Sequence, residues 1–340
     1  MPAAAADPGL QVFSTCPPSA LGQSDSYLRQ VREIASWSEA AGCEGILVYT
    51  DNGQVDPWLA AQAIIGATRR LCPLVAIQPV YMHPYSVAKM ITSLAFLHGR
   101  RVHLNMVAGG FKNDLEALND RTPHDERYER LAEYTTVIQQ LLRGAGPVSF
   151  EGRYYQVKNL RLTPPLPPAL MPDILLSGSS EAGMATALRL GATPVEYPKS
   201  PSECAEATVN GVARGLRVGI IARASESDAW SVAEARFPAD RKGQLTHQLA
   251  MKVTDSAWHK QLSRRDAGQG GGRDPYWLVP FQNYKTFCPY LVGSYPRVAE
   301  LLAGYVHAGY RTFVLDVPAS AEELEHIGAV IERATLRLAA

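Results

Sequence analysis

Residues 45–78, GILVYTDNGQVDPWLAAQAIIGATRRLCPLVAIQ, carry the clearest indication of the architecture of the chain. It holds two short apolar runs, GILVYT at 45–50 and PLVAIQ at 73–78, on either side of a segment of helical period at 56–68. Short apolar runs are typical of strands, and runs without a polar face favour strands buried on both sides of a parallel sheet. The stretch therefore predicts a strand, a helix and a second strand.

The same alternation continues outward in both directions along the chain. Strands are predicted at 12–15, 45–50, 73–78, 102–107, 173–178, 194–197, 216–222 and 312–317. Helices are predicted at 26–41, 56–68, 86–98, 125–142, 181–190, 203–213, 228–235 and 321–338. Such a series of strand–helix units predicts a (β/α)8 TIM barrel with insertions, and a doubly wound parallel sheet is the alternative architecture.

Two segments interrupt the alternation within what we expect to be a single TIM-barrel domain, residues 1–340. Residues 148–157 predict a hairpin insertion that turns at Glu151 and Gly152. Residues 237–285 contain the glycine-rich run AGQGGGRD at 267–274 and predict a mobile, lid-like insertion. Near the C-terminal strands of a barrel, such a segment closes over an active site or is a surface elaboration without a catalytic part.

Composition excludes several classes of protein. The 340 residues include 33 basic and 33 acidic side chains, so no global field draws in nucleic acid or an anionic membrane, and a small-molecule substrate is expected. Five scattered cysteines without metal-ligand spacing predict no metal and a reduced compartment. The sequence has no targeting segment and no apolar run long enough to span a bilayer, so we expect a cytoplasmic protein. Motifs of Rossmann, P-loop, zincin and α/β-hydrolase sites do not occur in it.

Two polar stretches mark a candidate anion site. SGSS, residues 177–180, ends a predicted strand and opens a helix, so its amides and the hydroxyls of Ser179 and Ser180 can surround a phosphate; the alternative is a simple helix N-cap. PHDERY, residues 123–128, brings His124, Arg127 and Tyr128 together at a helix start, which is either a group of donors or a solvated helix end.

The sequence resembles the luciferase-like flavin-dependent monooxygenases, and in particular their alkanesulfonate monooxygenase branch. The matching stretches are GILVYT with DPWLAAQ (56–62), LNMVAGG (104–110), PHDERYERLAEYT (123–135), SGSSEAG (177–183), DAW (228–230) and TFVLDV (312–317). The resemblance implies a barrel that binds reduced FMN (FMNH2) supplied by a separate NAD(P)H-dependent flavin reductase. It also implies that O2 adds to the flavin, and that the C4a-(hydro)peroxide transfers one oxygen atom.

The resemblance also implies where the cofactor binds. It places the FMN phosphate against Ser179, Ser180 and Tyr128, and it places Asn105 with the backbone around Val107 and Ala108 beside the isoalloxazine. Without the resemblance, Asn105 on an apolar strand could meet a flavin ring edge, but a satisfied core amide is the commoner case. The candidate cofactor-binding residues are Asn105, Val107, Ala108, His124, Tyr128, Gly178, Ser179 and Ser180.

This chain departs from the sulfonate enzymes at two of the active-site positions of that family. Gln54 stands where they have a cysteine, and Gly219 stands where they have a histidine in an ungapped alignment. Arg217 matches their strand-seven arginine in that alignment, whereas a four-residue deletion would remove the match. We therefore expect alkanesulfonates to be poor substrates, although lid cations could compensate. Those cations are Arg264, Arg265, Arg273 and Lys285.

The loop QPVYMHPY, residues 78–85, offers other groups on the catalytic face of a barrel. His83 is the candidate proton-transfer group because imidazoles exchange protons near neutral pH, and its alternative role is to hydrogen-bond the loop backbone. Cys16 is expected to line the pocket rather than act as a nucleophile. The candidate catalytic residues are His83, Tyr81, Gln54 and Arg217.

These observations predict an FMNH2-dependent monooxygenase that oxidises carbon, nitrogen or sulfur in a small metabolite of secondary metabolism, free or tethered to a carrier. Two alternatives stay open: a deazaflavin (F420)-dependent hydride-transfer oxidoreductase on the same barrel, and a flavin-binding protein without catalysis. We also expect a homo-oligomer.

Overall fold

The computed structural model describes residues 9–19, 24–204, 213–253 and 273–339. The parallel strands are β1 (Gln11–Thr15), β2 (Gly45–Val48), β3 (Cys72–Ile77), β4 (His103–Val107), β7 (Ile174–Ser177), β8 (Thr193–Glu196), β9 (Arg214–Arg223) and β12 (Tyr310–Leu315). The helices between and after them are α1 (Ser24–Ala40), α2 (Pro57–Ala67), α3 (Pro84–His98), α5 (His124–Arg143), α6 (Glu181–Leu190), α7 (Pro201–Cys204), α8 (Glu226–Arg236) and α13 (Ala321–Ala339). This is the order of a (β/α)8 barrel, and the predicted fold class is confirmed.

The chain divides into two compact units. Unit 1 comprises residues 1–15, 40–43 and 195–340, and unit 2 comprises residues 16–39 and 44–194. A single TIM-barrel domain over residues 1–340 stays a prediction.

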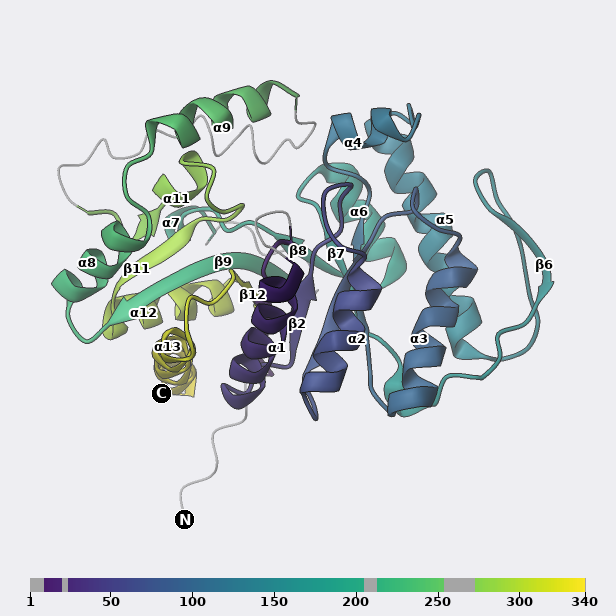
Figure 1. Cartoon of the computed structure of the whole chain (residues 1–340), viewed down its shortest axis with the longest axis horizontal. Helices are drawn as coiled ribbons and strands as arrows, with labels where there is room; N and C mark the ends of the chain where they lie inside the picture. Colours follow the sequence, from purple (N-terminus) through teal and green to yellow (C-terminus); the bar gives the residue numbers. More distant parts are fainter. Residues whose placement is uncertain (1–8, 20–23, 205–212, 254–272, 340) are drawn as a thin grey trace, which may run out of the picture. The chain divides into compact units, whose positions relative to one another are not determined.

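Unit 2 is built on four parallel strands in the order β2, β3, β4 and β7. Val48 lies beside Val75, Ile77 beside Met106, and Val107 beside Ser177. Strands β2 and β3 are buried along their whole length, because α2, α3, α5 and α6 pack around the sheet (Figure 1). The register brings the C-terminal ends of the strands, with the loops that follow them, to one edge, where active sites of parallel barrels form.

A hairpin lies on the outer side of α5 in unit 2 (Figure 1). Strands β5 (Val148–Glu151) and β6 (Gln156–Leu160) pair antiparallel, so the second strand extends beyond the predicted hairpin. The following connection is tied to α3, because the Lys89 ammonium donates to the carbonyl of Thr163. Two short helices of this unit, α4 (Lys112–Ala117) and η2 (Pro168–Leu170), were not predicted.

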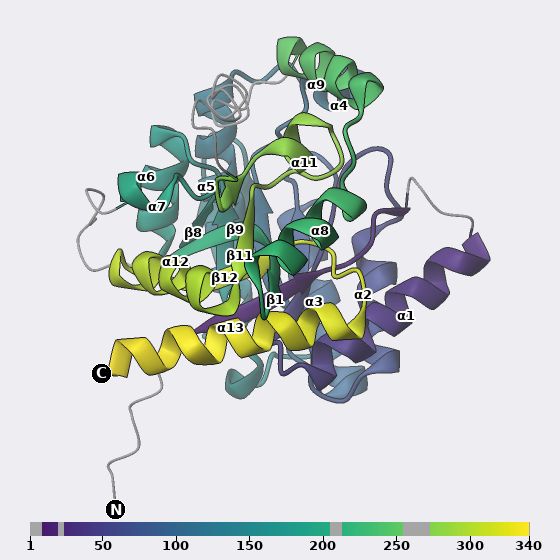
Figure 2. The same cartoon turned by 90° about the vertical axis from the view of Figure 1, so that its left-hand side faces the viewer.

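Unit 1 is organised by the long strand β9. Its first half pairs with β12, and its second half pairs with β11 (Tyr290–Ser294), while β12 also pairs with β1. Helix α12 (Tyr295–His307) packs beside α13 (Figure 2). Neither β11 nor α12 was predicted.

The segment predicted as a lid, residues 237–285, contains three helices and strands before and after residues 254–272, which lie outside the described residues. These are α9 (Arg241–Val253), β10 (Tyr276–Trp277) and α11 (Val279–Gln282). Most of the glycine-rich run lies outside the described residues, as do Arg264 and Arg265. None of the helices in the described ranges is long and apolar enough to cross a membrane.

Candidate active site

The N-terminus of α6 forms a cradle with Tyr128 of α5. A Cβ atom added to Gly178 would lie 2.5 Å from the Tyr128 hydroxyl, so only glycine lets the phenol approach this backbone. The same ring lies 3.2 Å from the corresponding position on Gly183. Two glycines therefore place a buried phenol over the first turn of α6, whose amides attract anions.

The serines of this turn differ in their environments. Ser180 is the N-cap of α6, because its hydroxyl accepts the backbone N–H of Gly183 at 3.1 Å, and it also lies within hydrogen-bonding reach of Tyr128. Burial raises the pKa of Tyr128, so the phenol keeps its proton. Ser179 is exposed, and its hydroxyl forms no hydrogen bond within the described part of the chain. Ser180 is thus a helix N-cap, and Ser179 has a hydroxyl that can bind an anion.

Asn105 is buried on β4, and only the oxygen of its side-chain amide forms a hydrogen bond with the described residues. Its Oδ1 accepts the hydroxyl of Ser177 at 2.8 Å, and its NH2 group has no partner among residues that the structure describes. Val107 at the end of β4 is half-buried, and Ala108 is buried directly after it. This strand end thus offers one amide donor above an apolar surface.

At the start of α5, His124 lies beside the cradle. Its ring makes an edge contact with Tyr128 at 5.3 Å between centroids, and its Nδ1 lies 2.7 Å from the carboxylate of Asp125. Arg127 is buried next to Tyr128. The sequence PHDERY is therefore more than a solvated helix end, because two of its side chains pack inward.

The loop 78–85 uses its two candidate catalytic residues in hydrogen bonds. His83 is exposed and is the N-cap of α3, since its Nδ1 accepts the backbone N–H of Tyr85 at 3.1 Å. In its neutral form the ring then carries its proton on Nε2. Tyr81 donates to Oδ1 of Asn52 at 2.8 Å, and burial together with Asp114 raises the pKa of Tyr81 to about 12. Tyr81 is therefore a neutral donor at physiological pH.

The hairpin holds this loop in place. The Tyr134 hydroxyl donates to the carbonyl of Met82 at 3.0 Å, and the Tyr155 hydroxyl donates to that of Pro79 at 3.5 Å. The ring of Tyr155 also contacts those of Tyr134 and His83. Because Tyr155 belongs to the hairpin turn, the insertion supports the loop that carries His83.

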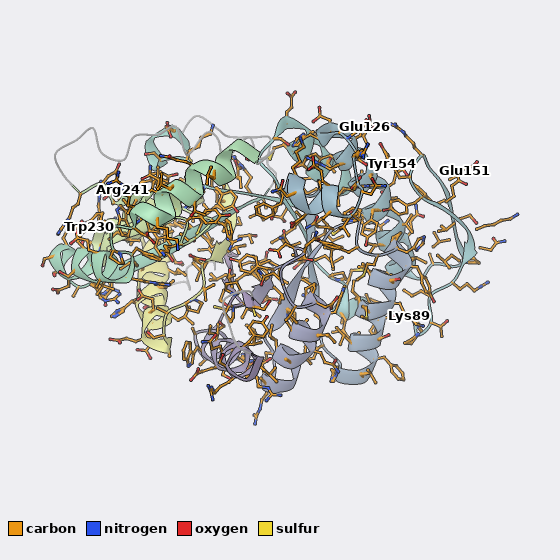
Figure 3. The ribbon with its side chains drawn as sticks, turned by 45° about the horizontal axis from the view of Figure 1, so that its top comes forward. Lys89, Glu126, Glu151, Tyr154, Trp230 and Arg241 are labelled. Carbon is orange, nitrogen blue, oxygen red and sulfur yellow. The ribbon has the colours of Figure 1, made fainter. Side chains whose placement is uncertain are left out.

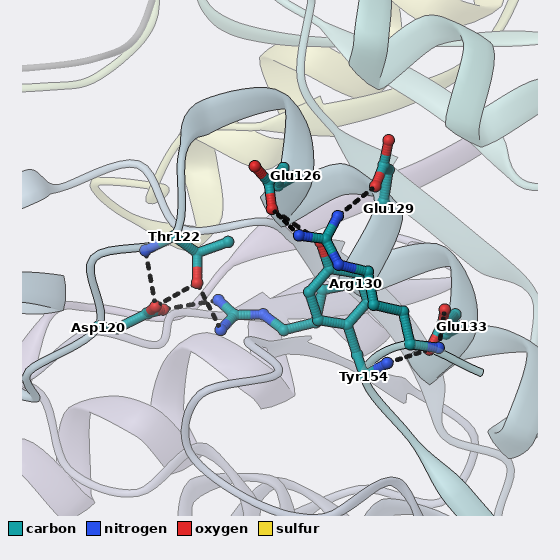
Figure 4. A network of polar contacts seen from close by, with 8 residues as sticks. Asp120, Thr122, Glu126, Glu129, Arg130, Glu133 and Tyr154 are labelled. Carbon is teal, nitrogen blue, oxygen red and sulfur yellow. Dashed lines mark hydrogen bonds and ion pairs between the residues drawn. The ribbon is translucent and has the colours of Figure 1, made fainter. Parts of the chain in front are cut away.

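Polar contacts with side chains of α5 hold the hairpin turn in place (Figure 4). The Glu133 carboxylate accepts the backbone N–H groups of Arg153, Tyr154 and Tyr155 at 2.9, 2.8 and 3.1 Å. The Arg153 guanidinium pairs with Glu126 at 2.7 Å. Figure 3 shows that Tyr154 lies near Glu126. It also shows Glu151 on the outer edge of the hairpin. Helix α5 thus connects the cradle, the hairpin and the loop.

Two further sequence candidates have structural roles. The Gln54 Oε1 accepts both the N–H and the hydroxyl of Ser19, at 2.7 and 2.9 Å, so its amide fixes the segment after β1. Burial raises the pKa of Cys16 to about 12, so this thiol stays protonated and is a poor nucleophile. A catalytic role for Gln54 remains a prediction.

Unit 1 contains a separate buried polar cluster that includes Arg217. The Arg217 Nη2 lies 4.0 Å from Asp316, whose Oδ2 accepts the hydroxyls of Thr286 and Tyr290 at 2.5 and 2.8 Å. Sequence analysis did not single out Asp316, Thr286 or Tyr290. Asp316 could have been found, because it is the one carboxylate in the apolar run TFVLDV.

A steric constraint explains why position 219 is a glycine. A Cβ atom at this position of β9 would lie only 2.3–2.4 Å from ring carbons of Tyr290 on the neighbouring strand β11. Tyr290 is almost completely buried, and its hydroxyl is fixed on Asp316. No larger side chain fits at position 219 while Tyr290 occupies this place.

One group of described side chains has metal-ligating chemistry, namely Glu44, Cys72 and His103. The backbone N–H of Asp173 donates to Nδ1 of His103 at 3.1 Å, which leaves the proton of the neutral ring on Nε2, 3.6 Å from Glu44. A metal could bind Nε2 only if its proton moved to Nδ1, which already accepts the Asp173 N–H. Burial raises the pKa of the Cys72 thiol to about 11 in this structure. The group lies at the N-terminal ends of the strands.

Comparison with known sequences gives a family match over most of the chain. A sequence profile of the luciferase-like monooxygenase family matches residues 10–312. The 4-(γ-L-glutamylamino)butanoyl-[BtrI acyl-carrier protein] monooxygenase BtrO of Niallia circulans is 34% identical over 314 residues, which cover 90% of this chain and 91% of that protein.

Solved structures with the same fold bind different cofactors. The oxygenating constituent of 3,6-diketocamphane monooxygenase from Pseudomonas putida, in complex with FMN, has a TM-score of 0.69 at 14% identity, over 97% of this chain and 99% of that chain. An F420-dependent secondary alcohol dehydrogenase has a TM-score of 0.66 at 16% identity, over 96% of this chain and 99% of that chain. The fold by itself therefore leaves the cofactor open.

Proposed function

This chain is an enzyme that belongs to the luciferase-like monooxygenase family, and on that premise we propose that it transfers one oxygen atom from O2 to an organic metabolite with reduced FMN. A separate NAD(P)H-dependent flavin reductase would supply the reduced flavin. The observation that carries the proposal is the cradle of Tyr128 and Gly178 over the first turn of α6.

The cradle fits the phosphate of FMN. The missing Cβ of Gly178, the Tyr128 phenol and the unpartnered Ser179 hydroxyl border the N-terminus of a ten-residue helix, where amides and the helix dipole favour an anion. The free NH2 of Asn105 and the surface of Val107 and Ala108 suit the edge and face of a flavin ring. The 34% identity to a monooxygenase favours FMN over F420.

The protein's own residues would position the reactants and manage protons. Bound reduced FMN supplies two electrons for the activation of O2. Tyr81 keeps its proton because its pKa is raised, and its hydroxyl donates to Asn52, so it would help to position the loop rather than supply a proton. The Nε2–H of His83 would be the proton source. The buried strand ends keep water from the reacting atoms, which limits wasteful release of peroxide.

We propose an acyl group on a carrier protein as the substrate, rather than an alkanesulfonate. The similar monooxygenase BtrO acts on a carrier-tethered acyl group. In this chain the guanidinium of Arg217 is balanced by Asp316, so it carries little excess positive charge for a sulfonate. Gly219 adds no donor of its own.

A turnover screen tests the proposal. The enzyme is incubated with FMN, a flavin reductase, NADH and O2, and with either 4-(γ-L-glutamylamino)butanoyl thioesters or alkanesulfonates. We expect products that gain one oxygen atom from the thioesters and little sulfite from the sulfonates. Efficient sulfite release would contradict the substrate class. Oxidation of an alcohol with F420 in the absence of O2 would favour the hydride-transfer alternative.

A further inference from the structure

The outer face of α9 in unit 1 combines exposed leucines with cations. Leu245 and Leu249 are one helical turn apart and are 56% and 64% exposed. Arg241 and Lys242 are exposed at the start of the same helix, and Figure 3 labels Arg241 at this end. We call these four residues the α9 face.

The opposite side of α9 fixes the helix to unit 1. The ring of His247 makes an edge contact with Phe281 at 4.6 Å, and Gln244 donates to the amide oxygen of Asn283 at 3.1 Å. Asp240 caps the first turn by accepting the N–H of Gly243 at 2.9 Å, and it pairs with Lys285 at 2.7 Å. These contacts hold the inner face of α9 on unit 1, so the outer face keeps a defined orientation.

The cations of the α9 face do not stabilise their own helix. Cations at a helix N-terminus oppose the helix dipole, and α9 has no acidic residue in its first turn. Neither Arg241 nor Lys242 has an ion-pair partner within the described ranges. Two exposed leucines that follow two exposed cations along one helix suit a partner surface that is acidic and partly apolar.

We propose that the α9 face docks the acyl carrier protein that brings the substrate, an inference that rests on the proposed function. Carrier proteins of this kind are small, acidic and helical, and they present the acyl group on a flexible arm, so their charge matches the cations of the α9 face. Asn283 and Lys285 anchor α9, and the next residue, Thr286, donates to Asp316 in the buried polar cluster. A face this small predicts a weak, transient complex.

The test compares two substrate forms in matched variants. The substrates are the BtrI carrier protein loaded with 4-(γ-L-glutamylamino)butanoyl and the N-acetylcysteamine thioester of the same acyl group. We expect R241E/K242E and L245S/L249S to raise KM for the loaded carrier at least about tenfold and to leave the small thioester unaffected. The control L336S/R337E removes an exposed leucine and a cation from α13 of the same unit, and it should change neither substrate.

Binding is also measured without turnover, by fluorescence anisotropy of the labelled carrier at two salt concentrations. We expect wild-type affinity to fall with added salt and to fall about tenfold in both α9 variants. Wild-type affinity in those variants would overturn the docking site, and so would an α9 variant that changes the oligomeric state instead, because the face would then bind a second copy. If the carrier binds through α9 while neither thioester is oxidised, the proposed function fails and the docking site stands.

Discussion

Gly178 and Tyr128 allow the cradle to be tested one atom at a time. In Gly178→Ala the new methyl group would meet the Tyr128 hydroxyl at 2.5 Å, which we expect to cost about 1–3 kcal/mol of unfolding free energy and to weaken FMN binding. Adding Tyr128→Phe removes the clash, because the remaining ring atoms lie at 3.4 and 3.5 Å. The double variant should regain stability in urea unfolding but not FMN affinity. Equal stability of Gly178→Ala and wild type would show that the Tyr128 hydroxyl does not approach Gly178 this closely.

The serines of the same turn separate capping from cofactor binding. Replacing Ser179 and Ser180 together by alanine should weaken FMN binding by about 1–3 kcal/mol in a fluorescence-quenching titration. The control is Ser225→Ala, which removes the N-cap of α8, where the serine hydroxyl accepts the N–H of Asp228 at 3.1 Å. It should cost about 1 kcal/mol of stability and leave FMN affinity unchanged. Unchanged affinity in the double variant would remove the phosphate from this turn.

His83 can be tested because asparagine is also a good N-cap. His83→Asn should keep the cap on α3, whereas His83→Ala should lose about 1 kcal/mol of stability with it. If His83 moves a proton in the reaction, both variants should lose about 10²-fold in kcat. Thermal unfolding and steady-state kinetics measure the two effects separately. A fully active asparagine variant would reduce His83 to its capping role.

Site residues in local motifs could be predicted from the sequence, whereas contacts between distant residues could not. SGSS indicates the end of a strand and the start of a helix, so Ser179 and Ser180 could be singled out. That Tyr290 fills the space beside Gly219 could not, because the contact depends on the pairing of β9 with a strand that was not predicted.

At the element scale, the hairpin has a supporting role that can be measured. Glu133→Ala would leave three backbone N–H groups of the turn without their acceptor, which we expect to cost about 1–3 kcal/mol. Glu129→Ala is the control, since Glu129 only faces the Arg153 guanidinium at 3.6 Å on the exposed side. Hydrogen exchange should speed up in residues 78–85 in the first variant alone. Protection of that loop in Glu133→Ala would mean that the hairpin does not support it.

Most elements with a strong hydrophobic period were predictable, and a short strand that ends in glycine and serine was not. Helix α6 begins and ends at the predicted residues, with Ser180 as its N-cap and Gly191 after its end. Strand β11 was missed because YLVGS is short and ends in glycine and serine. Helix α12 carries a usable signal that we overlooked, namely a proline in its first turn.

For the whole molecule, the alternation of strands and helices was enough to predict the barrel, but the cofactor could not follow from it. FMN and F420 occupy solved structures with this same fold. The choice depends on which groups meet the ring and its phosphate, and on sequence similarity to a monooxygenase. The chemistry must therefore be measured.

Labelled oxygen tests the central claim most directly. The enzyme is loaded without oxygen with reduced FMN and with the best substrate from the turnover screen, and it is then mixed with ¹⁸O2 for a single turnover. We predict a product that contains one ¹⁸O atom, detected by mass spectrometry, and no product when oxygen is left out. An unlabelled product, or one that forms equally fast without oxygen, would contradict the proposal that this chain is a flavin-dependent monooxygenase.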